Sequence, residues 1–501
     1  MNSHLVILPV LVPMATAVAL MLWPARNYAG RRMISLAGVV ALLMVVLGLL
    51  ELVLASGSQP YYVGDWPAPF GIVLLADRAS ILLLLTTAVL ALAALLFALR
   101  GEDGRGRRYH ALFHFQLMGV NGAFLAADLF NLFVFFEVLL IASYALLMHG
   151  TGKSRTRAAL HYVILNLTGS SLFLIALGMI YAGAGSLNMA HVSQLVAQAS
   201  GQSELLLRGA GLLLLVVFGL KGALLPTLFW LPRTYAAAVG SVGALFAIMT
   251  KVGIYAMLRV FYLLYGEHAG ALAGLMDSWL LWLGLATLAM GALGILAAES
   301  LRRVAVWMVI LSAGTLLVVI SWRDEASTAA AMYYLMHTTW ATAAMFMLVA
   351  LVRQQCGDSG DHLKHVTVRP GRGMAPLFLV SALIAAGLPP SSGFFAKLQL
   401  LVSSGGLAHA SWYWWAILLA GLVMLIALSR AGSSLFWRRE DIGAPPLDRL
   451  GLAAVCGLLL ATLVLVVWLQ PAMEFSRGAA QDLLDSAAYQ AAILGHQEGQ
   501  P

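Results

Sequence analysis

Fourteen long apolar stretches, separated by short polar segments, account for most of the chain. An α-helix that crosses a bilayer needs about 20 mostly apolar residues, and each stretch approaches or exceeds that length. The predicted membrane-spanning segments are 5–23, 34–54, 72–99, 111–127, 128–148, 161–182, 206–230, 239–265, 279–298, 304–322, 328–352, 375–402, 412–436 and 451–470. The pattern predicts an all-α polytopic membrane protein of about fourteen transmembrane helices, with residues 1–501 forming a single membrane domain.

Basic residues are concentrated in alternate loops. The loops after helices 1, 3, 5, 11 and 13 carry, in order, Arg26, Arg31 and Arg32; Arg105, Arg107 and Arg108; Lys153, Arg155 and Arg157; Lys364, Arg369 and Arg372; and Arg438, Arg439 and Arg449. The loops after the even-numbered helices carry almost no Lys or Arg beyond Arg323. Because cytoplasmic loops collect Lys and Arg, this alternation supports the helix count and predicts that both termini lie outside the cytoplasm.

The composition agrees with lipid as the solvent. Hydrophobic residues make up 61% and charged residues 10% of the 501 residues, whereas about a quarter of a soluble domain is charged. The net charge of +7 comes from loop arginines and indicates membrane topology.

Cys356 and Cys456 are the only cysteines and lie far apart, so the sequence predicts neither a CxxC metal site nor a cofactor. The N-terminal stretch lacks a basic region and a cleavage site, which favours a retained first helix.

Three lysines and one glutamate lie well inside predicted helices. Lys221, Lys251 and Lys397 are three of the five lysines, and Glu137 lies among apolar and aromatic neighbours. Lysine at mid-bilayer costs roughly 2.5–3.5 kcal/mol even on lenient scales, and a buried carboxylate needs a partner or a hydrated cavity. An inert Glu–Lys bridge is the structural alternative, but it would leave two lysines unexplained. The pattern therefore favours a function in ion movement.

Proline residues interrupt two of the helices that carry these lysines. Pro226 follows Lys221 by five residues, and Pro389 and Pro390 precede Lys397. Because proline cannot donate a backbone hydrogen bond, helices 7 and 12 are expected to break, and irregular backbone at membrane depth lines cavities or is buried in protein. Helices 7 and 12 are five apart, which predicts inverted five-helix repeats over helices 4–8 and 9–13. The predicted parts are 1–110 (helices 1–3), 111–265, 279–436 and 451–501 (last helix and tail).

Several other polar residues are secondary candidates. His161, His337, Asp77 and Asp128 lie within or beside predicted helices, and a histidine can relay protons, although packing roles account for each equally well. Asp77 and Arg78 are expected to form an interfacial pair. Arg259 and Arg430 lie near helix ends and are expected to reach the interface by snorkelling, as long basic side chains do.

Four stretches carry a family resemblance. They are DLFNLFVFFEVLLIASYALL, LKGALLPTLFWLPRTYAAA, ALFAIMTKVGIYAMLRV and GLPPSSGFFAKLQLL, and together they resemble the D subunit of the multisubunit Mrp (Mnh, Sha, Pha) cation/proton antiporters. The resemblance implies the fold of the antiporter-like subunits of respiratory complex I, with fourteen helices, inverted repeats and discontinuous helices 7 and 12.

The resemblance also implies roles for the buried residues. Glu137 matches the essential glutamate of helix 5, and Lys221, Lys251 and Lys397 match the lysines of helices 7, 8 and 12, which together form a polar axis for protons. Related subunits often carry a lysine a few residues after the histidine that matches His337, where this chain has Trp340, Ala341 and Thr342. Many relatives also carry a proline near the position of Ser241.

The leading hypothesis is one subunit of a hetero-oligomeric Na⁺ or K⁺/H⁺ antiporter in a bacterial inner membrane. In this hypothesis Glu137 holds Lys221 charged, and the proton passes to Lys251 and Lys397 when that pair separates. The alternative is an antiporter-like proton-pumping subunit of a complex I or membrane-bound hydrogenase assembly, distinguished by co-purifying flavin or iron–sulfur absorbance. A passive channel or structural subunit is a third interpretation, and it does not require titratable residues beside broken helices.

Overall fold

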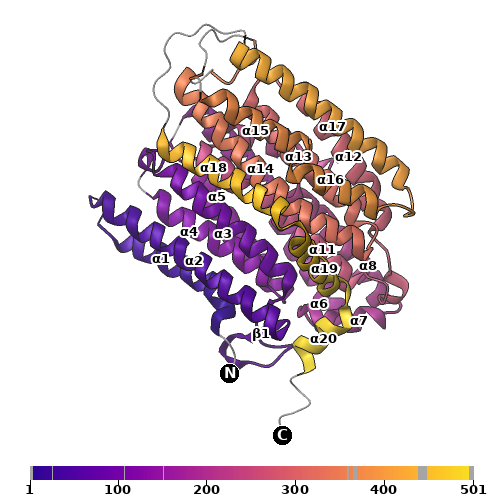
Figure 1. Ribbon diagram of the computed structural model, residues 1–501. Coiled ribbons are helices and arrows are strands. Elements are labelled where there is room, and N and C mark those ends of the chain that lie inside the picture. The colour runs from indigo at the N-terminus through magenta and orange to yellow at the C-terminus, as the bar shows by residue number, and fades with distance from the viewer. Residues whose placement is uncertain are drawn as a thin grey trace.

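The structure, a computed structural model, is a bundle of long helices with one small β-hairpin (Figure 1). It describes residues 4–24, 26–106, 108–150, 152–357, 360–364, 370–371, 373–437 and 448–495. Five arginines of the predicted cytoplasmic loops lie outside the described residues, namely Arg107, Arg369, Arg372, Arg438 and Arg439. The last part of the predicted C-terminal tail, 496–501, also lies outside them.

Four helices and the hairpin form the N-terminal part. They are α1 (Leu8–Leu22), α2 (Tyr28–Ser56), α3 (Arg78–Ala98) and α4 (Tyr109–Leu125), with β1 (Gln59–Tyr62) and β2 (Val73–Ala76) between α2 and α3. The strands are antiparallel, with Gln59 opposite Ala76. α1 packs against α2 and α4, while α3 lies deeper and is mostly buried. The hairpin was not predicted from the sequence, because its four-residue strands are too short to show a period.

The next part contains the first interrupted helix. Its helices are α5 (Leu129–Leu147), α6 (Lys153–Ala184), α7 (Met189–Ala197), α8 (Gln202–Gly222), α9 (Trp230–Ala237), α10 (Gly240–Phe246) and α11 (Met249–Leu264). α6 begins eight residues before the predicted start at 161, because a helix continues beyond the apolar stretch where its polar side chains reach water. The short α7 lies in the loop between the predicted segments 161–182 and 206–230.

The following part contains the second interrupted helix and a long helix that is almost entirely buried. Its helices are α12 (Asp277–Leu296), α13 (Leu301–Ile320), α14 (Glu325–Cys356), α15 (Met374–Ala386), α16 (Ser392–Ser403) and α17 (Ala410–Gly432). α14 packs against α10, α13, α16, α18 and α19, and nearly all of its residues are buried. Polar side chains on α14 therefore lie in the interior of the bundle.

Three helices end the described chain. They are α18 (Arg449–Val467), α19 (Leu469–Leu484) and α20 (Ser486–Leu494). In Figure 1 they run, in yellow, from one end of the molecule to the other, and α18 and α19 pack against α3 and α14. The prediction of one last helix and a tail missed α19 and α20. α19 buries Met473, Ala480 and Leu483 along one face, so its polar residues hide it from a search for long apolar segments.

The protein is a nearly all-helical, polytopic membrane protein. In the described residues, twelve helical segments are long and apolar enough to cross a membrane. Two further predicted segments, 111–127 and 375–402, correspond to α4, which has 17 residues, and to the pair α15 and α16, which have 13 and 12 residues. The count of fourteen, the division into parts and the inverted repeats stay predictions.

Candidate functional site

The first helix break lies directly after Lys221. α8 ends at Gly222, and Ala223 adopts a left-handed conformation with φ 63°. The indole Nε1 of Trp230 donates to the carbonyl of Leu220 at 3.0 Å, and the backbone N–H of Leu225 donates to Thr287 Oγ1 of α12 at 2.9 Å. These side chains replace backbone hydrogen bonds that an unbroken helix would make. The break predicted from Pro226 is therefore present, and it begins three residues before that proline.

Gly253 brings the broken end of α8 against α11. A Cβ at Gly253 would lie 2.6 Å from the backbone nitrogen of Gly222 and 2.8 Å from the carbonyl carbon of Lys221. Only glycine permits two backbones to approach this closely. Gly253 is two residues from Lys251 in the chain, so this contact places the backbones of the two lysine-bearing segments side by side.

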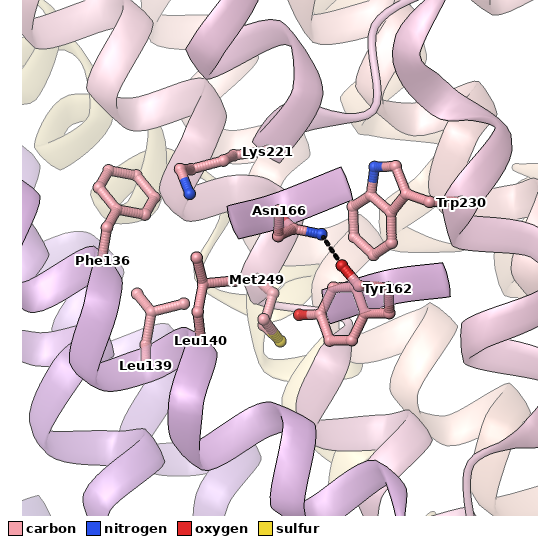
Figure 2. Close-up of a pocket in the computed structure, with 8 residues that line it drawn as sticks. All are labelled: Phe136, Leu139, Leu140, Tyr162, Asn166, Lys221, Trp230 and Met249. Carbon is pink, nitrogen blue, oxygen red and sulfur yellow. Dashed lines mark hydrogen bonds between the residues drawn. The ribbon is translucent and has the colours of Figure 1, made fainter. Parts of the chain in front are cut away.

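A small pocket lies beside Lys221 (Figure 2). It is lined by Phe136, Leu139, Leu140, Tyr162, Asn166, Lys221, Trp230 and Met249. Lys221 Nζ lies 5.1 Å from the centroid of the Phe136 ring, a cation–π contact, and it has no hydrogen-bond partner among the described residues. Asn166 Nδ2 donates to the carbonyl of Tyr162 at 3.1 Å, while its Oδ1 is unpartnered within the same described part of the chain. Two buried polar atoms with unmet hydrogen bonds thus share one pocket.

Glu137 lies on α5 next to Phe136 and is partly buried. Its carboxylate accepts a hydrogen bond from the Ser170 hydroxyl of α6. Glu137 is close enough to Lys221 for the charges of the two side chains to attract each other, although no hydrogen bond joins them. The geometry is that of a separated pair, in which a serine holds the carboxylate and an aromatic ring faces the ammonium.

Lys251 lies in the centre of the bundle and is fully buried. Its Nζ donates to Ser312 Oγ of α13 at 2.9 Å and lies 3.4 Å from Thr250 Oγ1. Two hydroxyl oxygens are therefore the neighbours of this ammonium. No carboxylate within the described ranges forms an ion pair with it at 4.0 Å or less.

The second helix break lies beside Lys397. α15 ends at Ala386, Gly387 has φ 78°, and α16 starts after Ser391, whose hydroxyl accepts from the N–H of Phe394. Lys397 Nζ donates to the carbonyl of Ala386 at 2.6 Å. A Cβ at Gly387 would lie 3.1 Å from that Nζ. The break predicted from Pro389 and Pro390 is present, and it exposes the acceptor that the lysine uses.

His337 of α14 lies beside the start of α16. Its Nδ1 forms a 2.9 Å hydrogen bond with Ser392 Oγ at the start of α16, and Lys397 lies within electrostatic range of its ring. On its other side, Tyr334 lies 6.2 Å away between ring centroids.

Tyr334 extends the polar contacts toward Lys251. Its hydroxyl lies against the side chains of Thr315 and Thr338, and Thr315 is one helical turn from Ser312 on α13. Hydroxyl groups on α13 and α14 therefore contact Lys251 on one helix and lie beside His337 on the other. Trp340, the first of the three residues that stand in the region where related subunits often carry a lysine, donates its indole N–H to the carbonyl of Thr86 at 3.0 Å.

Three secondary candidates lie away from these contacts. His161 is exposed on α6, whereas the next residue, Tyr162, is buried. Asp128 caps the start of α5 and accepts from the N–H of Asn131 at 2.8 Å. Asp77 caps α3 and accepts from the N–H of Ser80 at 2.8 Å.

Two expectations for charged residues were wrong. Arg259 does not snorkel: its side chain is 4% exposed and forms an ion pair with Asp77, which is 1% exposed. Asp77 does not pair with Arg78, which instead lies 3.6 Å from Asp482 Oδ1 of α19. The position near a helix end misled the first prediction, because α19 and α20 cover this end of the bundle and keep it from lipid. Adjacency in sequence misled the second, since residues at a helix start point in different directions.

Several polar residues around the site were missed by the sequence analysis. They are Ser170, Asn166, Ser312, Thr315, Tyr334 and Ser392, each of which contacts or lies beside the buried charges. Hydroxyl side chains in membrane helices commonly bond their own backbone, so a single sequence does not mark those that face a lysine. Taken together, a multi-pass bundle with Glu137, Lys221, Lys251 and Lys397 inside it and two interrupted helices beside these charges defines a membrane transport protein.

The chain belongs to the proton-antiporter family described as NADH:quinone oxidoreductase/Mrp antiporter, TM, whose profile matches residues 126–427. The D subunit of a probable K(+)/H(+) antiporter from Rhizobium meliloti is 37% identical over 98% of both chains. The D subunit of the Na(+)/H(+) antiporter from Bacillus subtilis is 36% identical over 98% of this chain and 99% of its own.

Solved structures share the fold. A chain of the Mrp complex from Dietzia sp. superimposes with a TM-score of 0.86 at 25% identity, over 98% of this chain and 100% of the other. A chain of an archaeal membrane-bound sulfane sulfur reductase gives a TM-score of 0.89 at 22% identity, over 98% and 100%. Respiratory complex I from Thermus thermophilus gives 0.79 at 21% identity, over 96% and 99%. The last two likenesses concern the fold alone.

Proposed function

We propose that this chain is the proton-translocating subunit of a multisubunit Na⁺ or K⁺/H⁺ antiporter. The observation that carries the proposal is that Lys221 and Lys397 each lie at a helix break while Lys251 is fully buried in α11, which packs against the broken end of α8. The names of the D-subunit relatives support the antiporter assignment. The membrane is proposed to be a bacterial inner membrane, with both termini on the non-cytoplasmic side.

The proposed relay begins at Glu137 and Lys221. Glu137 can bind Ser170 or attract the ammonium of Lys221, since opposite charges in a medium of low polarity attract strongly. In this structure Glu137 is held by Ser170, and Lys221 faces Phe136 without a hydrogen-bond acceptor in the described chain. An ammonium without acceptors is destabilised, so this arrangement favours transfer of the Lys221 proton toward the centre.

The proposed second half runs from Lys251 to Lys397. Ser312, Tyr334 and His337 supply groups that can both donate and accept a hydrogen bond, so they can pass a proton along. His337 contacts Ser392 at the start of α16, next to the break that Lys397 spans. We propose that His337 makes this connection without the additional lysine that related subunits carry, and that His161 takes no part in it.

The proposed antiporter is a complex that contains other subunits. Relatives of this chain are D subunits, and a similar solved chain belongs to a whole Mrp complex. We propose the same hetero-oligomeric setting here, with this chain supplying the proton pathway. The transported cation is either Na⁺ or K⁺, the two named for the relatives.

A proton-pumping subunit of a redox complex is the second candidate, because chains of such complexes have the same fold. The relatives of 36–37% identity favour the antiporter. Purification of the native complex distinguishes the two: flavin or iron–sulfur absorbance in the complex supports the redox assembly, and its absence supports the antiporter.

The direct test of function uses everted membrane vesicles that contain the whole complex in a strain without other antiporters. A pH gradient is formed, and its collapse is followed after addition of Na⁺, K⁺ or Li⁺ across a pH series. The proposal expects collapse with at least one of these cations, and expects none in vesicles whose complex lacks this chain. Equal collapse with and without the chain contradicts it.

A further inference from the structure

Three buried polar side chains form a row along α11, beginning at Lys251, and we call this row the file. Lys251, Tyr255 and Arg259 are spaced four residues apart, which places them on one face of the helix. Their exposed fractions are 0%, 2% and 4%. At about 1.5 Å of rise per residue the file extends about 12 Å. It points toward the end of the molecule that carries α20 and the β1–β2 hairpin (Figure 1), which we call the hairpin face.

Hydrogen bonds connect Tyr255, Arg259 and Asp77. Arg259 donates to the Tyr255 hydroxyl from Nε at 3.1 Å and from Nη2 at 2.9 Å. Tyr255 donates its hydroxyl hydrogen to the carbonyl of Phe124 at 2.9 Å. Arg259 Nη2 also forms the buried ion pair with Asp77. One guanidinium therefore joins a phenol on the Lys251 side to a carboxylate on the surface side.

The file reaches the surface beyond Asp77. The backbone N–H of Arg78 donates to Asp482 Oδ2 of α19 at 3.0 Å, and the side chains of Arg78 and Asp482 are 35% and 19% exposed. Burial and the charge of Asp77 raise the pKa of Asp482, which suits a carboxylate that exchanges protons with water. The Tyr489 ring of α20 covers the guanidinium of Arg259 at 5.2 Å.

A purely structural ion pair is the simpler explanation for Asp77 and Arg259. Buried pairs are often no more stabilising than apolar residues of the same size. A structural pair also needs no connection to Tyr255 or to a lysine in the middle of the membrane. Two observations favour a pathway: Tyr255 and Arg259 lie on the same face of α11 as Lys251, and Arg259 binds both Tyr255 and Asp77, next to the partly exposed Asp482.

We propose that Tyr255, Arg259 and Asp77 form a proton outlet between Lys251 and the hairpin face. This inference rests on the proposed relay function. In the transfer, the Lys251 ammonium loses one proton and becomes neutral, the Tyr255 hydroxyl passes a proton on, and the Asp77 carboxylate gains one and becomes neutral. Arg259 keeps its charge and orients both groups. Asp77 then releases its proton to water beside Asp482.

The first test compares two tyrosines of α11 in the assembled complex. Tyr255→Phe removes the hydroxyl of the outlet, while Tyr262→Phe removes an equally buried hydroxyl that bonds Thr328 at 3.1 Å. Cation-driven proton movement is measured in vesicles and divided by the amount of assembled complex. We expect a loss of tenfold or more for Tyr255→Phe and a change of less than twofold for Tyr262→Phe. Equal rates in the two variants overturn the outlet.

A second test separates conduction from folding. Asp77→Asn leaves the Arg259 charge unpaired and can reduce assembly, so it is combined with Arg259→Gln, which removes both charges. We expect the double variant to assemble normally and to transport at least tenfold more slowly, whereas a structural pair predicts that assembly and transport recover together. Recovered transport overturns the outlet. Glu137→Ala is included as a test of the relay. Normal transport by Glu137→Ala contradicts the relay. Loss of transport in Glu137→Ala together with normal transport in the outlet variants contradicts the outlet alone.

Discussion

Lys397 and Ala386 are joined across the break between α15 and α16 by a hydrogen bond of 2.6 Å from Nζ to the carbonyl oxygen. In an unbroken helix that carbonyl would accept from the backbone N–H four residues later, at position 390. Residue 390 is a proline and has no N–H to give. The proline thus frees the acceptor that the lysine uses, and the charge and the break form one structural unit.

Replacement of Lys397 by Met keeps the length of the side chain and removes its donor. The carbonyl of Ala386 then lacks its partner, at a cost of about 1–3 kcal/mol, and the proposed relay loses a proton carrier. We expect cation-driven proton movement in vesicles to be abolished while the complex still assembles. Leu398→Met, at an exposed neighbouring position, is the matched control. A Lys397→Met complex that transports at the wild-type rate would exclude Lys397 from the relay.

Replacement of Gly253 by Ala tests the close contact between α8 and α11. The added Cβ would meet backbone atoms at 2.6 and 2.8 Å, and backbone cannot move aside as a flexible side chain can. We expect a loss of stability of about 1–3 kcal/mol and slower transport, because Lys221 moves away from α11. Thermal unfolding in detergent measures the first effect. Gly457→Ala is the control, since nothing lies within 4 Å of a Cβ there, and equal melting of both variants would contradict the prediction.

Replacement of Ser312 by Ala removes the closer of the two hydroxyls at Lys251. A hydrogen bond to a charged group contributes about 1.5–3 kcal/mol, so we expect transport per complex to fall roughly tenfold, since about 1.36 kcal/mol corresponds to one factor of ten. Ser171→Ala serves as the comparison, because that hydroxyl is exposed and bonds only the carbonyl of Leu167 at 3.1 Å. Transport by the Ser312 variant that matches the Ser171 variant would show that Lys251 does not depend on this contact.

The buried Asp103 at the predicted cytoplasmic face makes stability depend on pH. Burial alone would raise the pKa of its carboxyl, but hydrogen bonds from His110 and Arg32 hold that pKa well below the usual 3.8. A lowered pKa means that the contribution to stability is present above about pH 4 and is lost as the pH falls toward the folded-state pKa. Arg32 donates to this carboxylate at 2.7 and 2.8 Å.

Asp103→Asn is therefore expected to lower stability by about 2 kcal/mol at neutral pH, less than for a fully buried pair because Arg32 is partly exposed. The difference from the wild type should narrow below pH 4. Melting temperatures in detergent between pH 3 and pH 8 check this, with Asp65→Asn at an exposed loop position as the control. A difference that stays constant down to pH 3 would rule out the carboxylate as its source.

The membrane fold was largely predictable because lipid imposes strong rules on sequence. Apolar length marked the spans, and Pro226, Pro389 and Pro390 marked both breaks. The helices that escaped prediction, α19 and α20, are amphipathic or short and lie against protein. Their location depends on packing against distant parts of the chain, which apolar length does not encode.

The charged members of the site were also predictable, whereas their partners were not. A lysine inside an apolar segment is conspicuous, so Lys221, Lys251 and Lys397 could be selected from sequence. Ser170 and Ser312 are ordinary residues of membrane helices and gain their importance only from the helix that faces them. Arg259 was misread because its partner, Asp77, is 182 positions away.

The central claim is that protons cross this subunit through its buried charges, beginning at Glu137. The most direct measurement is proton movement driven by Na⁺ or K⁺ in everted vesicles that contain the complex with Glu137→Gln, normalised to assembled complex. Glu299→Gln, at an exposed carboxylate between α12 and α13, is the matched control. The relay predicts no exchange with Glu137→Gln and full exchange with Glu299→Gln. Wild-type exchange with an unchanged cation dependence in the Glu137 variant would contradict it.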